Sequence, residues 1–87
     1  MPSRRFGSVR FVAYPQDHLP RHVHGFTGET EVIVDLLENR SVSLADRKDG
    51  IKPANTKRND VKLVLRKAAE HFDALVALWE EMHDENG

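Results

Sequence analysis

The sequence predicts an α+β protein in which a three- to four-stranded, mostly antiparallel sheet precedes one long C-terminal helix. In the first half, apolar residues alternate with polar ones, which is typical of strands with one buried face. In the last third, apolar residues recur every three or four positions, which is typical of an amphipathic helix. The 87 residues contain no linker or repeat, so we expect a single domain over 1–87. Its strands fall within 6–45, a loop covers 46–57, and the helix covers about 59–84.

Four segments have the composition of strands. Residues 6–14 alternate and end at Pro15, a residue that cannot continue a ladder. Residues 22–26 form a short second strand, and residues 29–37 are the most strand-like segment of the chain. Residues 42–44 follow a turn, and we expect them to complete an antiparallel hairpin.

The C-terminal helix begins near Asn59 or Asp60, either of which can cap it. Its apolar seam has heptad spacing and consists of Val61, Leu65, Ala68, Phe72, Leu75, Trp79 and Met82. Such a stripe most often packs a helix on its own sheet. A helix of about 25 residues is about 37 Å long, whereas a four-stranded sheet covers roughly 20 Å. Either part of the seam has another partner, or the helix breaks near Ala69–His71.

Charge is strongly segregated along the chain, although the net charge is only −1. Residues 47–67 carry eight basic and two acidic side chains, and residues 68–87 carry six acidic side chains with no Lys or Arg. The helix macrodipole prefers the opposite order. An antiparallel pair of helices would bring the basic half of one chain against the acidic half of the other. This predicts a homodimer through the 59–84 helix, and a solvated helix with two differently charged ends is the alternative.

Several classes of protein are disfavoured by what the sequence lacks. There is no cysteine, which excludes disulfide scaffolds, thiolate zinc sites and cysteine nucleophiles. No signal peptide follows Met1, and no apolar run approaches the roughly 18 residues of a membrane span. We therefore expect a cytoplasmic protein with no membrane partner. A nucleic-acid partner has little support, because the basic segment lacks interleaved aromatic residues.

The run from Asp17 to His24 concentrates the chemistry of the chain. Three of the five histidines lie within seven residues, at His18, His22 and His24. On an extended backbone His22 and His24 project from the same face, so their rings can converge. Pro20 stiffens the loop before them, and Asp17 is suited to accept a ring N–H.

Two interpretations of this run involve catalysis or a metal. In the first, His18, His22 and His24 bind zinc or a similar divalent ion and leave a position open for water. In the second, the same three histidines exchange protons with a phosphate ester, as in a metal-free phosphodiesterase or ribonuclease. That second interpretation also needs a cation to hold the phosphate, and the candidates are Arg5, Arg10 and Arg21.

Two further interpretations involve no chemistry. The imidazoles and Arg21 could recognise a partner protein or nucleic acid. Alternatively, the histidines only support the loop, with Asp17 capping a turn and Pro20 fixing it. In that case His22 and His24 hydrogen-bond to backbone or to carboxylates such as Glu29 or Glu31.

The chain resembles a small bacterial family known only as domain of unknown function 4160. The residues that carry the resemblance are Arg5-Phe6-Gly7, Val9-Arg10-Phe11, Tyr14, Asp17-His18, Pro20, His22-Val23-His24, Leu75 and Trp79. The family's hallmark is an Asp-His-x-Pro-Pro-His run with a second histidine two residues later. Arg21 replaces the usual second proline, Gly25 replaces the usual valine, and residues 47–59 form a longer middle segment than is typical.

The resemblance implies a protein partner rather than a reaction. Members are often encoded beside a second small protein and are sometimes described as toxin–antitoxin-like. Our leading interpretation is therefore an interaction module of a two-gene system, whose binding residues are Asp17, Pro20, Arg21 and Arg10. The alternative is a histidine- or metal-dependent nuclease or phosphodiesterase centred on Asp17–His24. Whether the protein is an enzyme stays open at this point.

Overall fold

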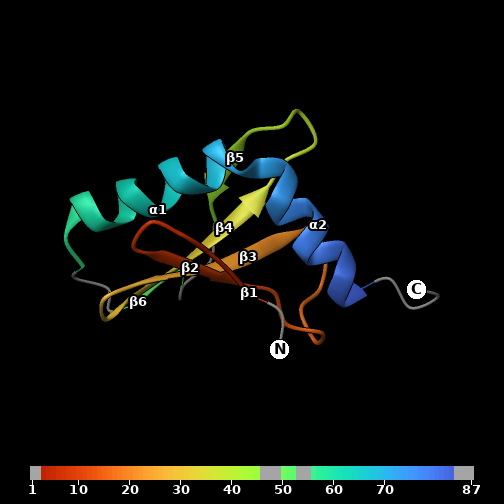
Figure 1. Cartoon of the computed structure of the whole chain (residues 1–87), viewed down its shortest axis with the longest axis horizontal. Coiled ribbons are helices and arrows are strands. Elements are labelled where there is room, and N and C mark those ends of the chain that lie inside the picture. The colour runs from red at the N-terminus through yellow and green to blue at the C-terminus, as the bar shows by residue number, and fades with distance from the viewer. Residues whose placement is uncertain (1–2, 46–49, 53–55, 84–87) are drawn as a thin grey trace.

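A computed structural model describes residues 3–45, 50–52 and 56–83. In these residues a six-stranded antiparallel sheet precedes two helices (Figure 1). The strands are β1 (Ser3–Phe6), β2 (Val9–Val12), β3 (His22–Thr27), β4 (Thr30–Leu36), β5 (Val42–Leu44) and β6 (Ile51–Lys52), and the helices are α1 (Arg58–Glu70) and α2 (Phe72–His83). The predicted α+β class is confirmed, with more strands than the three to four expected.

The sheet follows the chain order from β1 to β5, and every pair is antiparallel. β4 is the longest strand, and its outer edge pairs with β5 at one end and with β6 at the other. β6 matches Glu31 and Val32 of β4, a stretch that β5 does not reach. Together the two short strands cover an edge whose backbone groups would otherwise lack partners.

Three details of the predicted elements were wrong. Residues 6–14 do not form one strand, because Gly7 adopts a positive φ of 64° and turns the chain into the β1–β2 hairpin. The predicted loop 46–57 contains β6, while 46–49 and 53–55 lie outside the described residues. Neither Asn59 nor Asp60 caps the helix: α1 follows Lys57, which makes no side-chain capping bond. The predicted end of the helix at residue 84 also lies outside the described residues.

The C-terminal helical segment breaks at His71, which is one of the two alternatives that its length indicated. His71 has φ −118° and ψ 35°, which is not helical, and its ring stacks on Phe6 of β1 at 3.7 Å. The bend lets α1 and α2 follow the same face of the twisted sheet (Figure 1). The helix side chains in the core there are Val64, Ala68, Phe72, Leu75 and Leu78, while Trp79 is buried beside His22. No helix in the described ranges is long and apolar enough to cross a membrane.

The β4–β5 turn is tied to the start of α2. Arg40, with a positive φ of 66°, makes two hydrogen bonds to the Asp73 carboxylate, at 2.7 and 2.9 Å. These bonds from Arg40 lower the pKa of the Asp73 carboxyl and raise that of the guanidinium. Both side chains are exposed, so the pair adds little to the stability of the fold, and its main effect is to hold the turn beside α2.

Gly25 of β3 makes the close contact between sheet and helix possible. A Cβ at this position would lie 2.5 Å from Cγ1 of Val64 and 2.9 Å from Cε1 of Phe11. Val64 and Phe11 are both completely buried. The absence of a side chain on Gly25 therefore sets how closely α1 approaches β3.

Adding a methyl group at this contact should destabilise the protein. We expect Gly25→Ala to lower the free energy of unfolding by roughly 1–3 kcal/mol, because a packed core resists additional volume. Urea denaturation followed by circular dichroism measures the change. Gly25→Ala combined with Val64→Ala should be more stable than the sum of the two single effects implies. If Gly25→Ala alone were as stable as the parent, the proposed close packing would be wrong.

Candidate metal centre

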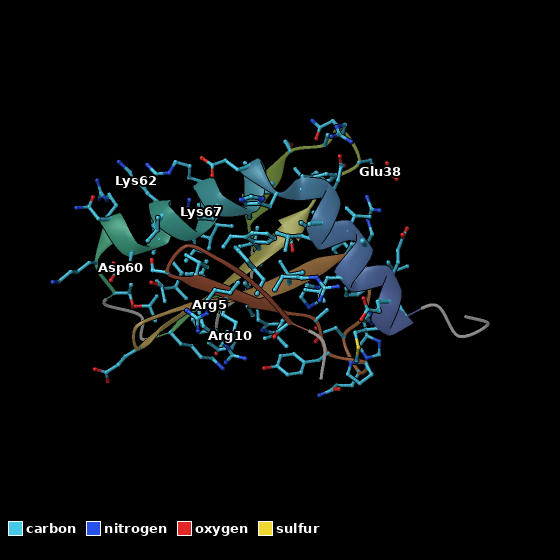
Figure 2. The ribbon with its side chains drawn as sticks, in the orientation of Figure 1. Arg5, Arg10, Glu38, Asp60, Lys62 and Lys67 are labelled. Carbon is cyan, nitrogen blue, oxygen red and sulfur yellow. The ribbon has the colours of Figure 1, made fainter. Side chains whose placement is uncertain are left out.

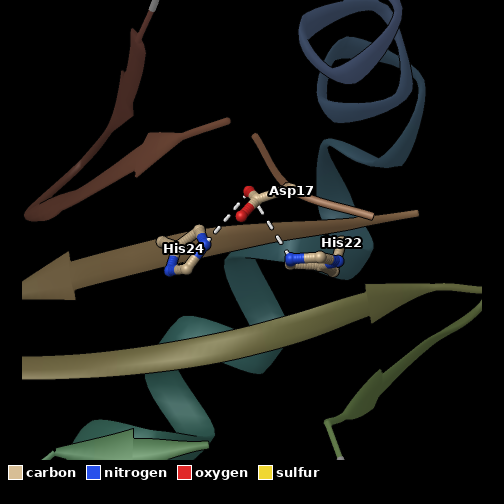
Figure 3. Close-up of side chains that lie close together, drawn as sticks. All are labelled: Asp17, His22 and His24. Atoms are coloured by element: carbon tan, nitrogen blue, oxygen red, sulfur yellow. Dashed lines mark hydrogen bonds and ion pairs between the residues drawn. The ribbon is translucent and has the colours of Figure 1, made fainter. Parts of the chain in front are cut away.

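Asp17, His22 and His24 converge on the sheet face opposite α1 (Figure 3). One ligand atom from each lies within 4.8 Å of the other two. His22 and His24 share a face because they are two residues apart on β3. Asp17 comes from the loop between β2 and β3, which folds over that face. We call these three residues the Asp-His-His cluster.

The loop that carries Asp17 is held at several points. The Asp17 N–H donates to the Tyr14 carbonyl at 3.1 Å, and the Tyr14 N–H donates to Asp17 Oδ2 at 3.2 Å. The Leu19–Pro20 peptide is cis. At the other end of the chain, Nε2 of His83 lies 3.1 Å from the Asp17 carbonyl oxygen. The turn predicted around Asp17 is therefore present.

His22 is buried, with 1% of its side chain exposed. Its Nδ1 lies 2.9 Å from the Pro20 carbonyl oxygen, an acceptor, so this nitrogen carries the proton. Its Nε2 has no hydrogen-bond partner among the described residues and lies 3.5 Å from Asp17 Oδ2. That distance is too long for a charge-assisted hydrogen bond. The ring therefore directs this buried nitrogen at a carboxylate oxygen.

His24 is oriented by two carboxylates. Its Nδ1 lies 2.9 Å from Oε2 of Glu31, and its Nε2 lies 3.2 Å from Oδ2 of Asp17. The Tyr14 ring meets the His24 ring edge-on, with centroids 4.8 Å apart. Solvent reaches His24 and Asp17, whose side chains are 11% and 14% exposed.

Helix α2 closes one side of the cluster. The Trp79 ring lies 5.4 Å from the His22 ring and stacks on His83 at 3.6 Å. Asp35 pairs with His22 across β3 and β4, and its buried Oδ1 has no hydrogen-bond partner in the described part of the chain. Sequence reasoning did not identify Asp35, Trp79 or His83 at the site. Only the tertiary fold brings α2 to the loop, so no local pattern could have indicated Trp79 or His83.

The predicted site residues are distributed over several places. His18 is exposed and lies outside the cluster, where Asp17 is the third member. Pro20 contributes its carbonyl oxygen to His22. Arg10 is exposed on β2, with its guanidinium 5.3 Å from the Phe26 ring centre. Of the carboxylates suggested for the histidines, Glu31 makes the contact.

Arg21 lies at a groove beside the cluster. The groove has a volume of about 460 Å³ and is lined by Leu19, Pro20, Arg21, Leu36, Leu37 and Glu38. Leu19 is 77% exposed and Leu37 is 36% exposed, so apolar surface meets solvent here. Exposed apolar surface of this kind often marks a protein contact.

The arrangement defines an α+β domain that carries two histidines and one carboxylate around a common point. The family described as Domain of unknown function (DUF4160) matches residues 8–80, which include the whole cluster. The chain belongs to this family. No curated protein and no solved structure matches the chain. Family membership supplies no reaction, so function must be argued from the site.

His22 is buried and His18 is exposed, so their substitution should affect the stability of the protein differently. We expect His22→Ala to lower the free energy of unfolding by about 2–4 kcal/mol, because it leaves a cavity beside Trp79. His18→Ala, at an exposed position, should stay within about 0.5 kcal/mol of the parent. Thermal and urea denaturation of the two variants test this. Equal destabilisation at the two positions would contradict the burial described for His22.

Proposed function

We propose that the protein binds a divalent transition-metal ion, zinc in the first instance, at the Asp-His-His cluster and uses it to hydrolyse a phosphodiester. The ligand atoms are Asp17 Oδ2, His22 Nε2 and His24 Nε2. The observation that carries this proposal is the buried His22 Nε2, which faces a carboxylate oxygen and has no hydrogen-bond partner in the described residues.

The tautomers explain why a cation fits between these atoms. His22 Nδ1 donates to the Pro20 carbonyl, so in the neutral ring its Nε2 presents a lone pair. Both ring nitrogens of His24 face carboxylate oxygens, and with its proton on Nδ1, toward Glu31, its Nε2 also presents a lone pair. Both lone pairs face the same oxygen, Asp17 Oδ2. Three electron-rich atoms at such distances repel one another in a partly buried site unless a proton or a metal ion lies among them.

The surrounding hydrogen bonds are those that metal-binding histidines usually have. A ligating histidine commonly donates its other ring N–H to a carboxylate or a backbone carbonyl, which fixes its orientation. Glu31 accepts such a bond from His24, and Pro20 accepts one from His22. Two imidazoles and one carboxylate suit zinc and also ferrous iron.

A three-ligand set leaves room for a water molecule, and a bound zinc ion would supply that water with a pKa near 7. In the hydrolysis, the water would lose one proton to solvent, its oxygen would form a bond to phosphorus, and the bond from phosphorus to the leaving oxygen would break. The leaving oxygen then takes a proton and departs as an alcohol. His18, exposed on the loop beside Asp17, is our candidate for the donor of that proton.

Metal binding can be tested on protein purified without a histidine tag. We expect one zinc ion per chain by mass spectrometry, and calorimetry should show Glu31→Gln weakening zinc binding by about 10- to 100-fold. Asp17→Asn and His24→Gln should remove stoichiometric binding. Trp79 is the only tryptophan, so its fluorescence should change as zinc reaches the neighbouring His22.

His18→Gln is the matched control, because it should keep zinc binding while slowing hydrolysis of RNA. Zinc binding that survives Asp17→Asn would place the ion elsewhere. Failure to bind zinc at micromolar concentration, with His22 carrying protons on both ring nitrogens in NMR spectra, would overturn the proposal. A proton would then fill the gap that we assign to the metal.

The second candidate is an interaction module of a bacterial, cytoplasmic two-gene system of the toxin–antitoxin kind. It is supported by the groove beside Arg21 and by the exposed Leu19 at its rim. The partner would be the second small protein of the same operon, with an apolar segment that enters the groove. This module and the metal site are compatible, because the groove and the cluster use different side chains of the 14–21 loop.

The homodimer is a separate proposal, supported by the charge segregation along the helices. The helix breaks at His71, and much of its apolar seam is buried inside the chain. A dimer interface on these helices would therefore contain fewer apolar side chains than one on a continuous helix. Light scattering at micromolar concentration should give twice the 9.9 kDa chain mass. Because charge pairing would hold the helices together, the dimer should dissociate as salt is raised. A monomeric mass at low salt would rule the dimer out.

A further inference from the structure

A row of side chains crosses the sheet face opposite the helices, next to the Asp-His-His cluster. The strand registers place Arg5 opposite Arg10, Arg10 opposite Phe26, and Phe26 opposite Glu31. His24 is two residues from Phe26 on β3, so it lies one row away on the same face. Two residues of a strand span about 6.6 Å. A guanidinium on this row is therefore within reach of a ligand at the cluster.

The two arginines of the row form an unfavourable pair. Arg5 and Arg10 are both exposed and directly opposite, and like charges in this position destabilise a sheet. In the described part of the chain, neither makes an ion pair with a carboxylate. Figure 2 shows both side chains on the sheet, away from Lys62 of α1. An external anion would relieve the repulsion.

Phe26 gives the row a second property. Its ring lies under the Arg10 guanidinium, 5.3 Å from the ring centre to Cζ. Unpaired bases stack on aromatic rings and on arginine planes in single-stranded nucleic acid complexes. The basic segment of α1 lacks interleaved aromatic residues in its sequence, whereas Arg5, Arg10 and Phe26 together provide both charge and stacking.

We infer that this row binds single-stranded nucleic acid, with Arg5 and Arg10 on the phosphates and a base against the Arg10–Phe26 pair. The inference rests on the proposed function, since it names the substrate of the metal site. The nucleic acid would cross this face of the sheet and bring one of its phosphodiesters to the Asp-His-His cluster. Arg5 and Arg10 are exposed and Phe26 is partly exposed, an arrangement that suits a polymer better than a small cyclic phosphodiester.

Binding can be measured without metal, so that it does not depend on the metal site. Fluorescence anisotropy with a labelled single-stranded RNA of about 12 nucleotides, in EDTA, gives the dissociation constant. Arg5→Gln combined with Arg10→Gln should weaken binding at least tenfold. The slope of log affinity against log salt should become shallower by about 0.7 for each phosphate that the variant no longer neutralises.

The matched control is Lys62→Gln combined with Arg66→Gln, which removes the same charge from exposed positions of α1. It should weaken binding less than threefold. Equal weakening in the two double variants would overturn the inference, because RNA would then be attracted to positive charge anywhere on the protein. Unchanged melting temperatures should show that both variants are folded.

Two further measurements separate this inference from the proposed function. Phe26→Leu should weaken RNA binding at least fivefold without changing zinc affinity. Zinc binding with no detectable RNA binding would overturn the inference and leave the metal site standing. RNA binding through Arg5 and Arg10 in a protein that binds no zinc would support nucleic-acid binding by this row and contradict the proposed metal site.

Discussion

Strand β3 packs against the helices with one face and carries the two histidines of the cluster on the other, and the rest of the structure depends on this alternation. Val23 and Gly25 face the helices, and the missing side chain at Gly25 admits Val64 and Phe11. Because side chains alternate along a strand, His22 and His24 then face the other way. A shift of one residue in register would exchange the two sets, burying imidazoles under α1 and exposing the core. Packing of the helix and orientation of the histidines are therefore one constraint.

That constraint explains how a small protein can hold a carboxylate oxygen close to two imidazole nitrogens that repel it. The core side chains on one face hold β3 in place, and the 14–21 loop is fixed by its own turn and by α2. Within that frame the ligand atoms of Asp17 and the two imidazoles lie within 4.8 Å of one another. A fixed group of this kind costs stability, and it would arrange the ligands in advance for the ion that we propose. The carboxylate of Glu31 and the carbonyl of Pro20 keep the two rings from turning away.

The sequence was sufficient for the parts of the fold that follow from short-range patterns. Period-two alternation indicated β3 and β4, and the mismatch between helix length and sheet width indicated either a break near His71 or a second partner for the seam. The β1–β2 hairpin was missed because Gly7 was treated as part of a continuous strand, although its positive φ reverses the chain. At the site, the shared face of His22 and His24 was predictable from spacing. The places of Asp35 and Trp79 were not, since each depends on contacts between distant segments.

The contact between His83 and the Asp17 carbonyl joins positions that are 66 residues apart in the chain. During synthesis the sheet strands leave the ribosome first, and the last turn of α2 leaves long after them. Until residue 83 has emerged, the loop that carries Asp17 lacks this anchor and Trp79 does not yet cover His22. A nascent or truncated chain can therefore contain every member of the cluster without these two contacts. The contacts of His83 and Trp79 with the cluster therefore form only when this last described helix is complete.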